Sequence, residues 1–210
     1  MSEYNPFVEV DSEVFHFIKH HHQEMTWYSG KESLDSNYFM VDVDTMKLGW
    51  GKWSATKGYE YYWQDDLFTA IPRPGDDFSK AFSVWVLPKW VGDNNSVEHD
   101  PKLWRRHSFG EYKGFMNMGA CFFNELKLPE NQGKLPIVKH TQSEKIGTGN
   151  GGTSIPHFEL VGFKERPDTF VLPQYGEHSE GDNSPVNLTD SPSESKVEER
   201  KPIVDDEIPF

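Results

Sequence analysis

The chain has 210 residues, a formal net charge of −13 and an aromatic content of 14%. This length fits one folded domain with or without a tail. The excess of acids excludes bulk attraction to phosphates as the only means of binding nucleic acid. A single cysteine, Cys121, excludes an internal disulfide, and no apolar run is long enough to span a bilayer, so we expect a cytoplasmic protein without membrane contact.

The first predicted element is a helix over residues 12–24. Ser12 is a favourable N-cap, and apolar residues recur along one side of the segment. His16 and His20 are four positions apart and could share a metal ion on such a helix, but no cysteine pair or His-Glu-x-x-His pattern accompanies them. We therefore expect no metal site and no cofactor.

The rest of the body is predicted to be mostly strand, because runs rich in β-branched and aromatic residues alternate with turn residues. Short strands at this spacing favour a mainly β fold with one minor helix, either a small barrel or a sandwich. Pro136 cannot donate to a ladder, so its run is predicted to be an edge strand or no strand at all. The predicted strands cover residues 38–43, 48–53, 59–63, 81–87, 112–118, 135–140 and 158–163.

A ring-rich block between residues 50 and 63 is the first cluster that could bind a ligand. Alternate residues of a strand share a face, so Tyr59, Tyr61 and Trp63 should lie together. One face must fill the core, and the other would expose rings beside lysines as a stacking platform for bases. We predict that some of these rings form a binding surface. The candidate DNA contacts in this block are Trp50, Lys52, Trp53, Tyr59, Tyr61 and Trp63.

The densest basic stretch of the body is the segment 102–109. Arginine holds phosphates and stacks on bases, and aromatic rings provide stacking worth roughly 1–3 kcal/mol per base. The alternative to DNA contact is that the rings of this segment pack in the hydrophobic core while its arginines form ion pairs with the many acids. Both interpretations stay open. The candidate DNA contacts here are Trp104, Arg105, Arg106, Phe109 and Lys113.

Residues 147–153 form a glycine-rich run that we predict to be a loop between two strands. The run lacks the Gly-Lys-Ser/Thr ending that a phosphate-cradling P-loop needs. On a nucleic-acid-binding barrel this loop could close over a DNA strand. Lys139 and Lys145, which precede it, would then supply positive charge.

Pairs of acids are weak candidates for hydrolytic chemistry. Asp42 and Asp44 alternate on a predicted strand, and metal-dependent nucleases gather acids at strand ends. The acidic pairs at positions 65–66 and 76–77 are more typical of solvated turns. We therefore expect no catalytic site.

A change of composition after Pro173 divides the chain into a body, residues 1–173, and a tail, residues 174–210. The tail carries ten acids and three bases, a net charge of −7, and too few apolar residues to offset the entropy of ordering. We predict that the tail is disordered. As a flexible tether it would reach roughly 30–35 Å.

The last six residues join three carboxylates to a short apolar end, which suits docking into a pocket with a basic rim. They resemble the acidic C-terminal tip of bacterial single-stranded DNA-binding proteins, which also ends in acids followed by Ile-Pro-Phe. The resemblance implies a partner-binding tip in which the final Phe is the anchor and the acids meet a basic ridge. The residues concerned are Asp205, Asp206, Glu207, Ile208, Pro209 and Phe210.

The resemblance implies a single-stranded DNA-binding protein, not an enzyme, whose body is an OB-like β-barrel. It would coat single-stranded DNA by stacking and local basic contacts and recruit replication, repair or recombination proteins through its tip. The body is longer than the bacterial family's core and lacks its N-terminal strand pattern, which puts the family's tetramer in doubt and leaves homo-oligomers open. A divergent bacteriophage member, acting in the cytoplasm of a bacterial host, fits at least as well.

Two other functions stay open. One is an acidic mimic that occupies tip-binding pockets on host repair enzymes without binding DNA. The other is a metal-dependent nuclease that processes DNA.

Overall fold

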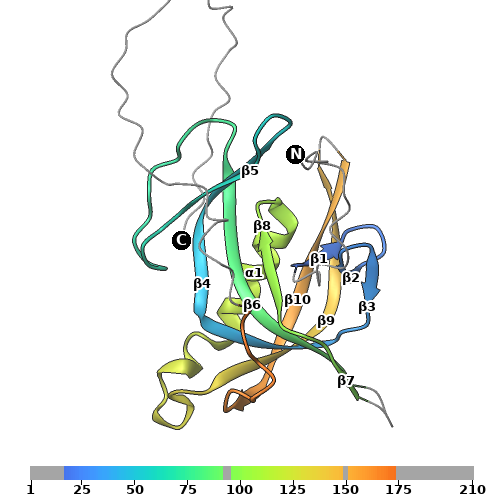
Figure 1. Ribbon diagram of the computed structural model, residues 1–210, viewed down its shortest axis with the longest axis vertical. Helices are drawn as coiled ribbons and strands as arrows, with labels where there is room; N and C mark the ends of the chain where they lie inside the picture. The colour runs from blue at the N-terminus through green and yellow to red at the C-terminus, as the bar shows by residue number, and fades with distance from the viewer. Residues whose placement is uncertain (1–16, 92–95, 149–150, 174–210) are drawn as a thin grey trace, which may run out of the picture. The chain divides into compact units, whose positions relative to one another are not determined.

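The computed structural model describes residues 17–91, 96–148 and 151–173, and these residues are mainly β, as the sequence predicted (Figure 1). The predicted tail 174–210 and the tip 205–210 lie outside the described residues, as does the first part of the predicted N-terminal helix. The division of the chain into body and tail stays a prediction.

The described residues form strands, one α-helix and two short 3-10 helices. In chain order these are β1 (Phe17–His21), β2 (Thr26–Ser29), β3 (Glu32–Leu34), β4 (Tyr38–Ser54), β5 (Gly58–Trp63), β6 (Ser79–Val91), β7 (Ser96–Glu98), β8 (Lys102–Arg106), α1 (Phe109–Phe122), η1 (Glu125–Lys127), η2 (Pro129–Asn131), β9 (Leu135–Thr148) and β10 (Gly151–Lys164).

The strands form one sheet in the order β10-β9-β4-β6-β8-β1-β2-β3, with β5 paired to β4 and β7 paired to β6. All of these pairings are antiparallel except that of β1 with β8, which is parallel. β4 and β6 run side by side through the centre of the sheet as long, curved strands (Figure 1). Within the described ranges no ladder joins β10 to the other end of this path, so the sheet is open.

The two strands predicted over residues 38–43 and 48–53 are a single strand, β4, with an irregularity between them. The register with β6 shifts between Asp42 and Lys47. Thr45 bridges the shift, since its hydroxyl donates to the Asp42 carbonyl at 2.8 Å and accepts the Trp85 N–H at 2.9 Å. The polar residues that suggested a turn are therefore a bulge that bends a continuous strand.

The predicted strand over residues 112–118 is wrong, because these residues belong to α1. Phe115, Met118 and Phe122 recur at helical spacing and are all buried in the main core with Phe82 and Trp104. Two glycines let the helix lie directly on β10. A side chain at Gly110 would collide with the Ser154 carbonyl, and one at Gly114 would collide with the Pro156 ring.

The predicted helix over residues 12–24 is also wrong where the structure describes it. Residues 17–21 are β1, which pairs with both β2 and β8. Burial alternates along this strand, so that Ile18 and His20 point into the protein. The imidazole of His20 is held by hydrogen bonds to distant strands, and this tertiary environment outweighs the local helical pattern.

The loop predicted over residues 147–153 is wrong for most of its length, because residues 147–148 belong to β9 and residues 151–153 belong to β10. β9 and β10 form a hairpin in which Gly151 pairs with Thr148 and Gly152 pairs with Gly147. The prediction for Pro136 is wrong, because β9 lies between β10 and β4. The proline is tolerated because it lies ahead of residues 137–139, where the ladder with β4 forms.

Candidate nucleic-acid interface

Three aromatic rings of β5 form a continuous stack, which we call the ring ladder: Tyr59, Tyr61 and Trp63. The first two ring centroids are 6.2 Å apart at an interplanar angle of 15°, and the last two are 5.0 Å apart at 8°. The period of two along a strand places these side chains on one face, as the sequence predicted. Such parallel, offset rings are a favourable aromatic arrangement.

Gly51 on β4 provides space for the ring ladder, whereas Gly49 lets the backbone of β5 approach closely. Gly51 is the partner of Tyr61 and Gly49 is the partner of Trp63. A Cβ atom at Gly51 would lie 2.8 Å from the Tyr61 ring and 3.1 Å from the Cβ of His107. The sequence reasoning missed both glycines, although their alternation opposite large rings is a readable signal.

Positive charge reaches the ring ladder from β8. The guanidinium of Arg105 lies 5.5 Å from the Tyr61 centroid and 5.6 Å from the Trp63 centroid, within cation–π range. His107, which the sequence reasoning did not single out, packs edge-on against Tyr59 and Tyr61. Burial lowers the pKa of His107, and the charge of Arg106 lowers it further. The His107 ring therefore adds an uncharged contact, and the positive charge beside the ring ladder comes from Arg105.

The outer end of this face is open to solvent. Trp53 pairs with Tyr59 across the hairpin, and both side chains are 58% exposed. Tyr61 is more enclosed, and burial raises its pKa despite the opposing charges of Arg105 and Arg106. The face therefore offers exposed rings at its end and a guanidinium along its side, which are the groups that stack on bases and contact phosphates.

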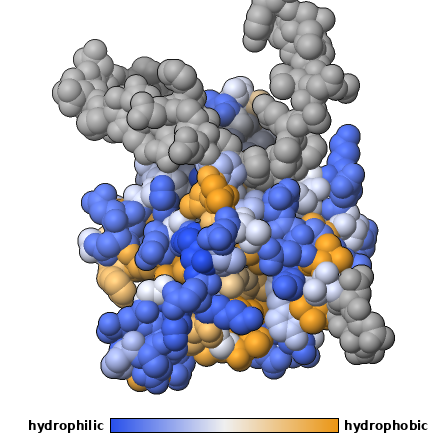
Figure 2. Space-filling view, turned by 60° about the horizontal axis from the view of Figure 1, so that its bottom comes forward, coloured by the Kyte–Doolittle hydropathy of each residue, from blue (hydrophilic) through white to orange (hydrophobic). Residues whose placement is uncertain are grey.

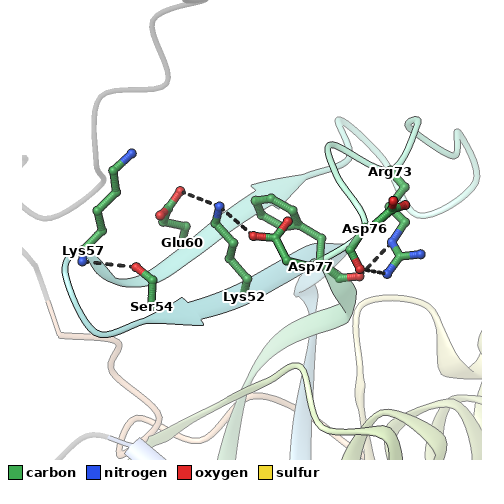
Figure 3. Close-up of polar contacts among 8 residues, drawn as sticks. Lys52, Ser54, Lys57, Glu60, Arg73, Asp76 and Asp77 are labelled. Carbon is green, nitrogen blue, oxygen red and sulfur yellow. Dashed lines mark hydrogen bonds and ion pairs between the residues drawn. The ribbon is translucent and has the colours of Figure 1, made fainter. Parts of the chain in front are cut away.

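The other two residues predicted in this block lie on the opposite face of the hairpin. The ammonium of Lys52 is 3.1 Å from the Asp77 carboxylate and 3.7 Å from that of Glu60 (Figure 3). The indole N–H of Trp50 donates to the Ile71 carbonyl at 3.0 Å. Both side chains thus hold the segment 64–78 against the hairpin, away from the ring ladder.

The basic segment 102–109 is divided between core and surface. Trp104 is only 2% exposed and donates its indole N–H to the buried carboxylate of Glu111 at 3.2 Å. Arg106 pairs with the same carboxylate at 3.3 Å. Trp104 and Arg106 fit the interpretation in which rings of this segment fill the core and its arginines pair with acids. Arg105 instead lies beside the ring ladder.

The remaining predicted contacts lie on other elements. Phe109 is exposed at the start of α1, with the ammonium of Lys113 5.7 Å from its ring. Lys139 on β9 pairs with Glu159 at 3.8 Å, and Lys145 is exposed on the β9–β10 hairpin opposite Ser154. The structure therefore brings five predicted residues together in one surface: Trp53, Tyr59, Tyr61, Trp63 and Arg105.

A buried polar network, also missed by the sequence reasoning, links β1 to β9 and β10. The His20 ring is 2.9 Å from the hydroxyl of Ser143 and 3.2 Å from that of Ser154. The Ser143 hydroxyl is also 2.9 Å from His140, to which Trp27 donates its indole N–H. Burial lowers the pKa of His20 to about 4 and also lowers that of His140. The network therefore connects β1 to β9 and β10, two strands with which β1 shares no ladder.

The acids considered for a nuclease do not assemble into a metal site. Asp42 is buried and its carboxylate pairs with Arg166 at 2.6 Å, whereas Asp44 is exposed. Across residues 17–91, 96–148 and 151–173, no group of three or more His, Cys, Asp or Glu side chains is arranged to hold a metal ion.

Comparison with known proteins provides no relative: no family model, no curated protein and no solved structure matches this chain. The α-helix that the structure describes is too short and too polar to cross a membrane.

Proposed function

We propose that the body binds single-stranded DNA on the face formed by the ring ladder, Trp53 and Arg105. The observation that carries this proposal is the stack of Tyr59, Tyr61 and Trp63 with a guanidinium alongside it. Every base has a flat face, so a stacking surface binds single strands with little dependence on sequence. A paired duplex hides those faces, which favours single-stranded over double-stranded DNA.

The fold proposed for the body is an open variant of the OB barrel, with β4, β6, β8, β9 and β10 as its strands. OB folds bind oligonucleotides on the second and third strands and on the loops that join the first to the second and the fourth to the fifth. The ring ladder lies in the connection between β4 and β6, and Arg105 lies on β8. The glycine-rich run lies where β9 gives way to β10 in the chain. This order of features along the chain supports the proposal.

A fluorescence titration with poly-dT tests DNA binding directly. Tyr59→Ala is expected to weaken binding about tenfold or more, because one exposed stacking ring is removed. Tyr62→Ala is the matched control, since Tyr62 lies on the same strand but packs edge-on against Phe78 on the other face. Quenching of tryptophan emission at low salt reports the complex. Equal losses for the two variants would contradict the assignment of the binding face.

The C-terminal tip is proposed to recruit replication, repair or recombination proteins. Deleting residues 205–210 is expected to leave the affinity for poly-dT unchanged or higher, because the tip competes with DNA for positive charge. The same deletion should abolish binding to a protein that recognises the bacterial family's tip, measured by calorimetry. A deletion variant that binds poly-dT much more weakly would count against the proposal that the body binds DNA while the tip binds proteins.

The acidity of the body favours a second function, a mimic that occupies tip-binding pockets without binding DNA. Residues 1–173 carry 24 acids and 18 bases. Because such a body repels phosphates in bulk, local contacts must overcome this repulsion if DNA binds. The absence of poly-dT binding by the full chain at low salt, together with retained binding to a tip-recognising protein, would select the mimic.

A further inference from the structure

Exposed apolar side chains do not by themselves mark a binding site on this protein. Figure 2, which brings the lower side of Figure 1 forward, shows apolar side chains exposed between hydrophilic ones on that side. More than half of the accessible surface of a typical folded protein is apolar, so a further feature is needed to indicate a site. The ring ladder has such a feature, because its two inter-ring spaces differ in width and each has a polar side chain beside it.

The space between Tyr61 and Trp63 is closed. The two ring centroids are 5.0 Å apart at an interplanar angle of 8°, so these rings already stack on each other and leave no room for a third ring. Both side chains are partly enclosed. The guanidinium of Arg105 lies beside this space, 5.5 and 5.6 Å from the two centroids. This end of the ring ladder therefore offers positive charge rather than a place for a base.

The space between Tyr59 and Tyr61 is wider. A flat ring inserted between two others needs about 7 Å between the flanking rings, because stacked carbon atoms lie about 3.5 Å apart. These two centroids are already 6.2 Å apart, and the rings are within 15° of parallel. The side chain of Tyr59 is 58% exposed, so it can move outward by the small remaining distance. The Tyr61 ring lies against Gly51 and provides a fixed floor.

His107 stands at the side of this wider space. Its ring centroid is 5.7 Å from that of Tyr59 and 6.2 Å from that of Tyr61, at interplanar angles of 64° and 69°. Together with the 6.2 Å between the two tyrosines, these distances form a nearly equilateral triangle. The imidazole therefore faces the space between the two rings and does not cover either ring alone.

The imidazole of His107 has a polar atom that the protein does not use. Its Nδ1 atom is buried and has no hydrogen-bond partner among the residues that the structure describes. Such atoms are rare in folded proteins, because leaving one unpaired is costly. Burial and the charge of Arg106 lower the pKa of His107, against the smaller opposing effect of Glu111, so the ring is uncharged at neutral pH. It then has one nitrogen that donates and one that accepts.

We propose that one nucleobase inserts between Tyr59 and Tyr61 with its edge hydrogen-bonded to His107. We call these three residues the base slot. A nucleobase has the required chemistry, because its faces are flat and stack on rings while its edge carries donors and acceptors. A purely apolar ring could fill the same space but would leave the imidazole nitrogen unpaired. A phosphate next to the inserted base would lie near Arg105, beside the neighbouring space.

The base slot rests on the proposed function and adds a single position at which binding depends on the base. Elsewhere on the face the strand is held by stacking and charge, which every base and every phosphate can provide. At the slot the bases differ, because each has its own pattern of donors and acceptors on its edge. One hydrogen bond gained or lost corresponds to a preference of about fivefold.

An abasic oligonucleotide that carries a single base separates the slot from the other contacts. Because only one base is present, it occupies the position that binds it best. Fluorescence anisotropy with the full chain at low salt should show that one uracil or cytosine raises the affinity over the fully abasic strand, by about tenfold for the preferred base. These two bases have the same ring and different edges, so their affinities should differ by about fivefold.

Four variants assign the two parts of this effect. Tyr59→Ala should remove most of the gain from the single base, whereas Tyr59→Phe should keep it, because stacking needs the ring and not the hydroxyl. His107→Phe should keep most of the gain but make uracil and cytosine bind equally. Tyr62→Ala should behave as the wild type, because Tyr62 packs against Phe78 on the other face of the hairpin.

Several results would overturn the base slot. One is a full gain from the single base in Tyr59→Ala, and another is an unchanged difference between uracil and cytosine in His107→Phe. Equal binding of the two bases by the wild type would also overturn it. Binding of poly-dT without any gain from a single base would overturn the slot alone, whereas failure to bind poly-dT at all would overturn the proposed function together with the slot.

Discussion

Replacing Arg166 with alanine is expected to lower the free energy of unfolding by about 3–5 kcal/mol, because the substitution leaves a buried charge without a partner. The carboxylate of Asp42 is 1% exposed and pairs with the Arg166 guanidinium at 2.6 Å. Neither carboxylate oxygen has a further hydrogen-bond donor among the described residues. Urea unfolding followed by tryptophan fluorescence measures the change.

The double variant Asp42→Leu with Arg166→Leu is the control for this result. Because it removes both charges, it should recover most of the stability that Arg166→Ala loses. A loss below about 1 kcal/mol for Arg166→Ala would mean that solvent reaches Asp42 and already stabilises its charge. Arg166 also lies 4.9 Å from the ring of Phe170, so part of the loss will come from the detachment of that ring.

Lowering the pH from 7 to 4 is expected to reduce the free energy of unfolding by about 3 kcal/mol through His20 alone. Burial lowers the pKa of His20 in the folded protein to about 4, from the ordinary value of 6.5. Between these two values the unfolded chain binds a proton that the folded chain does not bind, so stability falls as the pH falls. Below pH 4 both forms are protonated and the contribution of His20 stops changing.

The comparison of urea unfolding at several pH values identifies the residue responsible. His20→Gln keeps an amide that can bond to Ser143 and Ser154 but cannot be protonated, so its stability should depend less on pH between 6.5 and 4. The pKa of His140 is also lowered by burial, and this adds a change of the same sign. An unchanged pH dependence in His20→Gln would contradict the assignment to His20.

The arrangement of the ring ladder was predictable because it depends on a local rule. Tyr59, Tyr61 and Trp63 alternate along one strand, and the period of two alone places them on one face. The role of Trp104 was not predictable, since its burial depends on β8 lying between β6 and β1. Its neighbour Arg105 points the other way because successive side chains of a strand face opposite sides of the sheet. A single basic segment therefore contributes to both the core and the surface.

Two of the errors in the predicted secondary structure also have non-local causes. Residues 112–118 contain aromatic residues, which suggest a strand, but Gly110 and Gly114 let this segment pack on β10 as a helix. The histidine-rich segment around His20 has a helical pattern, but its imidazole is satisfied by hydroxyls more than 120 residues away. Neither contact leaves a trace in the local sequence.

The close stacking of the ring ladder also makes the β4–β5 hairpin optically distinctive. Tyr61 and Trp63 lie nearly parallel with centroids 5.0 Å apart, so their electronic transitions couple and energy absorbed by the tyrosine passes efficiently to the indole. Near-ultraviolet circular dichroism should therefore contain a strong signal from this one pair. The protein thus carries an intrinsic probe of hairpin integrity, which needs no attached label.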